Sequence, residues 1–192
     1  MYILDISLAN EMAHRKRIDF RSLTGHPQRA RLITMRTVRT MSDYVIRDPD
    51  FEARVRSSFD AQGAMALMGI RLVSAVPGAI EMVLDISDKV SQQQGFVHGG
   101  VVAAGLDSAC GFAALTLAAP SVEVLTIEFK TSFFAPSKGQ HLTFRSTVLK
   151  SGRRVSYCEA DAFSDDGRLV AKMSTSIAMV DMPDGWTPDK TK

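Results

Sequence analysis

Residues 98–119, HGGVVAAGLDSACGFAALTLAA, form a long segment that is apolar on every side and carries one charge, Asp107. A helix that is apolar all round has to be buried, either in a protein core or in a membrane. An unpaired carboxylate is unfavourable in such surroundings, so Asp107 needs a partner, a shifted pKa or a chemical role. The sequence therefore predicts a buried central helix with Asp107 as its candidate functional group.

A membrane span is the first alternative for this helix, because residues 99–119 are long enough to cross a bilayer. Four glycines, many alanines and a central aspartate make the segment a poor span, and no second one follows. The overall composition, 45% hydrophobic and 23% charged residues, is that of a globular domain with a core. The two cysteines, Cys110 and Cys158, have no metal-ligand spacing, which favours a reduced protein in the cytoplasm.

Charge divides the 192 residues unevenly. Residues 1–40 hold eight Lys or Arg against three acids, a net charge of +5, which leaves −3 for residues 41–192. The mildly acidic body offers no basic face for nucleic acid. We expect residues 1–45 to be a poorly ordered extension, 46–181 the folded domain and 182–192 a flexible tail. An organelle transit peptide, or a true start at Met41, is the alternative for the basic segment.

Periodicity around the central helix predicts an α+β fold. A helix is expected to begin at Asp48–Pro49, followed by strands over 70–76 and 79–87. After the central helix, four strand-like segments over 122–134, 140–149, 154–163 and 169–181 read as a meander. In the first of these segments, Leu125, Ile127, Phe129 and Phe133 alternate with Thr126, Glu128, Lys130 and Ser132. A largely antiparallel sheet curled around the central helix accounts for this order.

The start of the central helix suggests the chemistry. His98, Gly99 and Gly100 stand where the first backbone N–H groups of the helix have no internal partner and carry the positive end of its dipole. Such groups can bind an anion or a polarised carbonyl, while Asp107 can act as a base on water or as a nucleophile. Together they indicate hydrolysis of an activated acyl group. Structural alternatives are an N-cap for His98, close packing for the glycines and an internal cap for Asp107.

Spacing then adds a condition on the assembly. Gly99 and Asp107 are eight residues apart, about 12 Å along a helix at 1.5 Å per residue. One chain cannot bring both groups to the same carbonyl. If they cooperate, two subunits have to place their helices side by side, so the sequence predicts a site made at a dimer interface.

Other reaction classes find no support in the sequence. His14, His26 and His141 show no metal-ligand pattern, and no phosphate loop or dinucleotide fingerprint occurs. The nucleophile elbow G-x-S-x-G of serine hydrolases is also missing from the sequence. We therefore expect a reaction that needs neither a metal nor a redox cofactor.

The motif Gly95-x-x-His98-Gly99-Gly100, with an acid nine residues after the histidine, resembles the signature of hotdog-fold thioesterases of the phenylacetate-degradation (PaaI) type. The resemblance covers roughly residues 50–181 and includes the strand order. It implies a hotdog fold, a homodimer or homotetramer, and hydrolysis of acyl-CoA thioesters. It leaves open whether the acyl group is aromatic, medium-chain or long-chain.

The same resemblance implies roles for individual residues. Asp107 matches the catalytic acid of one subunit, and Gly99 matches the N–H that polarises the thioester carbonyl from the other, with His98 beside it. Thr126 matches a Ser or Thr that helps to place water or the intermediate. Gln92 stands where many relatives have Asn; it keeps the amide on a side chain that is one methylene longer, and Gln93 and Gln94 are the alternatives for its role.

Gly100 is expected to bind the substrate, and a basic turn, Lys150, Arg153 and Arg154, resembles the segment that contacts the nucleotide end of coenzyme A in relatives. The alternative is a solvated charged hairpin. Two rival functions are an acyl-CoA-binding module without catalysis and a hotdog hydratase acting on enoyl thioesters. The hydratases pair a catalytic His with an acid in a different motif, which this chain lacks.

Overall fold

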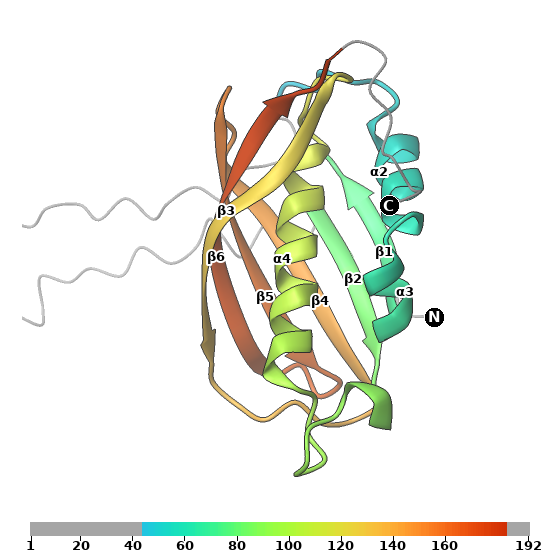
Figure 1. Cartoon of the computed structure of the whole chain (residues 1–192). Coiled ribbons are helices and arrows are strands. Elements are labelled where there is room, and N and C mark those ends of the chain that lie inside the picture. Colours follow the sequence, from blue (N-terminus) through green and yellow to red (C-terminus); the bar gives the residue numbers. More distant parts are fainter. Residues whose placement is uncertain (1–43, 184–192) are drawn as a thin grey trace, which may run out of the picture. The chain divides into compact units, whose positions relative to one another are not determined.

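An antiparallel sheet curled around one long helix is the main feature of the structure (Figure 1). The computed structural model describes residues 44–183, so the expectations for residues 1–43 and 184–192 lie outside the described residues. The helices are α2 (Phe51–Asp60), α3 (Gly63–Met68) and α4 (Gly99–Leu115), with a 3-10 turn η3 (Asp88–Val90). The strands are β1 (Ile70–Val76), β2 (Ala79–Asp85), β3 (Val122–Phe133), β4 (His141–Lys150), β5 (Val155–Ser164) and β6 (Leu169–Asp181). The predicted α+β class, with its antiparallel sheet around a central helix, is confirmed.

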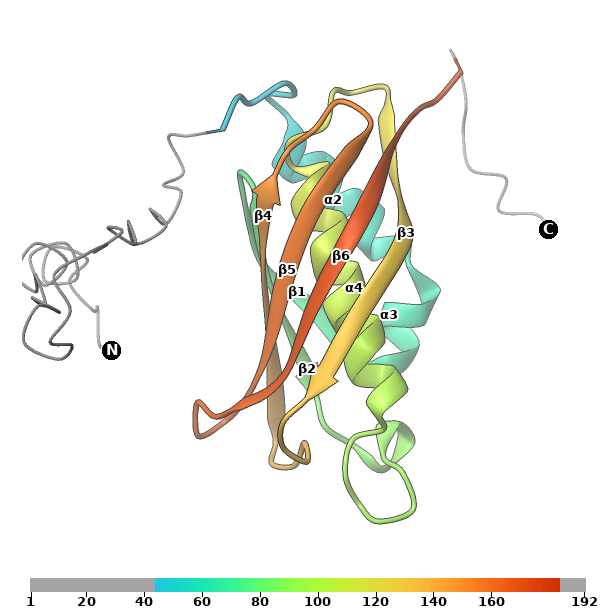
Figure 2. The ribbon, with the colours of Figure 1, turned by 90° about the vertical axis from the view of Figure 1, so that its left-hand side faces the viewer.

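The strand order is β1-β2-β4-β5-β6-β3, and every neighbouring pair is antiparallel. The expected four-strand meander is therefore wrong in one place, because β3 pairs with β6 and not with β4. Helix α4 carries the chain across the concave face of the sheet before β3 begins, and β4 then returns to pair with β2. As a result β3 is an edge strand beside α4, which Figure 2 shows face-on.

Helix α4 forms the centre of the core. The prediction that this helix is buried on every side is wrong, because one of its faces is open. Leu106, Ala109 and Cys110 are completely buried between the helix and the sheet. On the opposite side, Gly99 and Gly100 are exposed and Asp107 is half-buried. The residues on this open face are small, so the sequence shows no polar stripe that would have predicted an exposed side of the helix. None of the helices among residues 44–183 has the length and apolar character needed to cross a membrane.

Helix α2 begins at Phe51, two residues later than the Asp48–Pro49 start predicted from the sequence. The Asp48 carboxylate accepts a hydrogen bond from the backbone N–H of Asp50 at 3.0 Å, which makes a turn ahead of the helix. Arg54 fixes α2 to the connection between α4 and β3 by donating hydrogen bonds to the backbone carbonyls of Ala119 and Val122.

The close approach of α4 to the sheet gives a test of the core. A β-carbon on Gly105 would lie 2.4 Å from the buried ring of Phe144, whereas one on Gly111 would meet no atom within 4 Å. We expect Gly105→Ala to lower the free energy of unfolding by about 1–3 kcal/mol through overpacking. Gly111→Ala, the matched control in the same helix, is expected to raise it by about 0.5–1 kcal/mol. Urea denaturation measures both, and an unchanged Gly105→Ala midpoint would contradict this packing.

Candidate active site on the open face of the central helix

The N-terminus of α4 presents one unused backbone donor. His98 is the N-cap residue, and its Nδ1 accepts a hydrogen bond from the Gly100 N–H at 2.9 Å. A ring nitrogen that accepts is unprotonated, so the neutral His98 ring carries its proton on Nε2. The Gly99 N–H has no acceptor among residues 44–183, and Gly99 is exposed. This N–H therefore remains available to a ligand oxygen at the positive end of the helix.

Asp107 lies two turns further along the same helix, beside the edge strand. Its Oδ1 accepts a hydrogen bond from the Thr126 hydroxyl at 2.7 Å. Partial burial raises the pKa of the Asp107 carboxyl, while the Thr126 hydrogen bond acts in the opposite direction by favouring the charged form. Asp107 is the one acidic residue of α4, and Thr126 is the one described side chain that donates a hydrogen bond to it. The pair could serve as a general base or as a nucleophile with a fixed orientation.

The two halves of the candidate site stay apart within one chain. Gly99 and Asp107 are both on α4, so the helical rise alone separates them by about 12 Å. At the Gly99 end, the ring of Phe133 from β3 lies 3.5 Å from the position that a β-carbon on Gly99 would take. From the sequence, Phe133 is one of several apolar residues available to line an acyl pocket, and the structure adds its position beside Gly99.

Gly100 and Gln92 make local contacts at the predicted positions. The Gly100 N–H is occupied by His98, and a β-carbon there would lie 3.0 Å from the His98 Nδ1, so glycine permits this cap. Gln92 is half-buried in the loop before α4, where its Oε1 accepts a hydrogen bond from the Gln94 N–H at 2.6 Å and its Nε2 donates to the Gln94 Oε1. Both amide side chains are thus used within their own loop.

The basic turn lies elsewhere in the fold. Lys150, Arg153 and Arg154 are exposed at the β4–β5 hairpin, and none forms an ion pair with any residue from 44 to 183. This hairpin is at the end of the sheet where α4 finishes, away from Gly99 of the same chain (Figure 2). The three cations are therefore free to bind anions.

The strand that carries Thr126 differs from its predicted pattern. Leu125, Ile127, Phe129 and Phe133 were expected on one face, with Thr126 on the other. Instead the β3–β6 register shifts between Thr126 and Glu128, and Thr126 turns toward Asp107 on α4. A β-bulge adds one residue and so exchanges the faces of the residues beyond it. Nothing in the alternation of Thr126, Ile127 and Glu128 signals this bulge.

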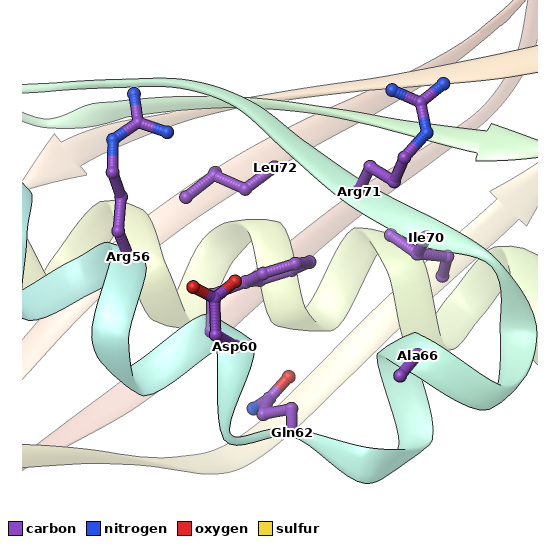
Figure 3. Close-up of a pocket in the computed structure, with 8 residues that line it drawn as sticks. Arg56, Asp60, Gln62, Ala66, Ile70, Arg71 and Leu72 are labelled. Carbon is purple, nitrogen blue, oxygen red and sulfur yellow. The ribbon is translucent and has the colours of Figure 1, made fainter.

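Two clefts formed by residues 44–183 lie away from these residues. One, of about 360 Å³, opens between α2, α3 and β1, and Figure 3 shows Arg56, Asp60 and Arg71 around it. Its arginines are engaged, Arg56 with Glu52 at 2.9 Å and Arg71 with Asp85 at 2.8 Å. The other, of about 400 Å³, is at the β5–β6 turn. The candidate site on the open face of α4 is therefore defined by its chemical groups and not by a cleft.

Within residues 44–183, no three His, Cys, Asp or Glu side chains lie close enough together to hold a metal ion.

Comparison with known proteins identifies the family to which the fold belongs. Residues 94–171 match the family model described as the thioesterase superfamily. A crystal structure of a thioesterase family protein from Silicibacter pomeroyi is 38% identical, covering 67% of this chain and 96% of that one, with a TM-score of 0.65. Human acyl-coenzyme A thioesterase 13 is 28% identical over 54% of this chain and 74% of its own. The PaaI protein of the E. coli phenylacetic acid degradation operon shares the fold, with a TM-score of 0.61 at 14% identity over 65% of this chain and 88% of that one.

The chain belongs to the thioesterase superfamily. The predicted hotdog fold and its PaaI-type resemblance are confirmed, and the protein is a thioester hydrolase.

The Thr126–Asp107 contact predicts the direction in which the carboxyl titrates. In Thr126→Val the carboxylate loses its donor while the burial remains, so the pKa of Asp107 should rise above its wild-type value. Thr126→Ser keeps a hydroxyl and should titrate close to wild type. The ¹³C chemical shift of the Asp107 carboxyl, followed from pH 3 to 8, measures both. A pKa that falls in Thr126→Val would contradict the assigned hydrogen bond.

Proposed function

We propose that this protein is an acyl-CoA thioesterase, which hydrolyses an acyl-CoA thioester to the free acid and coenzyme A. The observation that carries the proposal is the open face of α4, where a carboxylate held by Thr126 and an unpaired N–H at Gly99 are the groups available for chemistry. The kinship with acyl-coenzyme A thioesterase 13 supports coenzyme A as the leaving group.

In the reaction, the Gly99 N–H donates a hydrogen bond to the thioester oxygen as negative charge develops on it. Asp107 acts as general base by taking a proton from the attacking water, and the C–S bond then breaks. The departing thiolate takes up this proton and leaves as coenzyme A, while the acyl group leaves as the acid. Attack by the Asp107 carboxylate itself, with later hydrolysis of the anhydride, uses the same residues.

The surrounding residues support these two groups. His98, as N-cap, fixes the first turn of α4 and leaves the Gly99 N–H unpaired, while Gly100 gives the His98 ring its space. Gln92 steadies the loop that leads into the helix. Thr126 orients the Asp107 carboxylate.

The assembly is a homodimer, or a homotetramer built from such dimers, in which Gly99 of one subunit faces Asp107 of the other. The supporting observation is the edge strand β3, where Leu125, Ile127, Phe129 and Phe133 are between 48% and 61% exposed. A long apolar edge strand is an aggregation hazard unless another strand or chain covers it. A second copy meeting this edge would bring its own α4 to the open face.

The basic turn is assigned to the phosphates of coenzyme A. Lys150, Arg153 and Arg154 have no competing ion pair among the described residues, and their charges suit a ligand with several phosphate groups. The location is the cytoplasm, a proposal supported by the two buried thiols of Cys110 and Cys158, which remain free.

Thiol release from a panel of aromatic, medium-chain and long-chain acyl-CoAs tests this function. Asp107→Asn should lower kcat/KM by about 10²–10⁴, the contribution of a general base. Gly99→Pro should lower it by about 10²–10³, because it removes the donor. Proline suits the first helical position, and the extended backbone of His98, with φ −61° and ψ 133°, is compatible with a following proline.

Gly99→Ala is the matched control, since it keeps the N–H and its β-carbon meets Phe133 at an ordinary 3.5 Å. It should retain most of the activity. Undiminished hydrolysis by Asp107→Asn would contradict the mechanism, and acyl-CoA binding without any thiol release would show a binding module instead of an acyl-CoA hydrolase.

A further inference from the structure

A β-bulge interrupts the edge strand directly beside Thr126. Thr126 pairs with Ile177 of β6 and Glu128 pairs with the preceding residue, Ser176, so Ile127 has no partner in the ladder. The bulge is thus located between the residue that contacts Asp107 and the rest of β3.

This extra residue decides which way Thr126 points. Phe129 pairs with the fully buried Thr175 on the helix side of the sheet, and Thr126 precedes Phe129 by three positions. In a regular strand an odd separation puts two side chains on opposite faces, so Thr126 would point away from α4. Because of the bulge, Thr126 lies on the helix side and reaches Asp107.

The bulge is held by a side chain from the neighbouring strand. The hydroxyl of Thr175 donates a hydrogen bond of 2.7 Å to the backbone carbonyl of Glu128, the first paired residue after the bulge. On the opposite face, the Ser176 hydroxyl donates to the Glu128 carboxylate, also at 2.7 Å. A bulge loses regular ladder hydrogen bonds, and the Thr175 hydroxyl provides one in their place.

The burial of Thr175 gives this hydrogen bond its weight. Its side chain is 0% exposed, and a buried hydroxyl is unfavourable unless it is hydrogen-bonded. Valine has nearly the same shape without that requirement, so packing alone does not favour threonine at this position. The hydrogen bond to the Glu128 carbonyl offsets the cost of burying this hydroxyl.

We infer that Thr175 is a positioning residue for thioester hydrolysis: by fixing the bulge at Ile127 from the neighbouring strand β6, it keeps the Thr126 hydroxyl on the Asp107 carboxylate. The inference rests on the proposed function of Asp107. Thr175 itself touches neither Asp107 nor Thr126 through any hydrogen bond, so its influence passes through the backbone of β3.

The test combines the carboxyl titration of Asp107 with thiol release. Thr175→Val should move the titration of Asp107 to higher pH, as Thr126→Val does, and should lower kcat/KM on the order of tenfold through misplacement of the carboxylate. Thr175→Ser keeps the hydroxyl and should restore both values. In a Thr126→Val background, Thr175→Val should move the titration no further, since the donor is already absent.

Ser176→Ala is the matched control, because it removes the neighbouring hydroxyl, whose contact is with the Glu128 side chain instead of its backbone. It should leave the Asp107 titration unchanged. Should Thr175→Val not fold, Thr175→Ala makes the same deletion with a smaller side chain. A wild-type titration in a folded variant without the Thr175 hydroxyl would overturn the inference. Full activity of Asp107→Asn would instead refute the proposed function, whatever the titration shows.

Discussion

The structure depends on how a carboxylate is accommodated on an otherwise apolar central helix. The sheet covers α4 on the side of Leu106 and Cys110 and leaves Asp107 half-buried on the other. Burial raises the pKa of this carboxyl, and the Thr126 hydroxyl partly offsets that effect. A carboxyl whose pKa is shifted by partial burial and by a specific hydrogen-bond donor is typical of a functional site. Asp107 is therefore the residue on which the proposed chemistry depends.

The second constraint is the length of the helix itself. Its free N–H at Gly99 and its carboxylate at Asp107 are complementary in chemistry, yet the rise of the helix keeps them apart. Two exposed aromatic residues of β3, Phe129 and Phe133, lie on the same side of the sheet as this open face. If a second copy of the chain packed here, it would cover these rings and supply the missing group.

Much of the fold could be predicted from the sequence, because helix and strand periodicity is local. The bounds of β1 agree with the prediction, and those of β4 and β5 agree within one residue. The pairing of β3 with β6 could not be predicted, since it is a long-range contact that α4 imposes by crossing the sheet. Asp107 stood out because a single charge interrupts an apolar helix. The bulge beside Thr126 was missed because its residues read as regular alternation, and Thr175 was missed because its role is visible only through a backbone contact.

Subunit complementation measures whether two chains build each site. Asp107→Asn and Gly99→Pro homo-oligomers each lack one half of every site and should be inactive. After denaturation and refolding of an equal mixture, about half of the dimers should be mixed, and each mixed dimer should have one intact site. We predict that thiol release recovers to about a quarter of the wild-type value. A mixture that stays as inactive as its components would contradict the account, because it would mean that each site is formed within one chain.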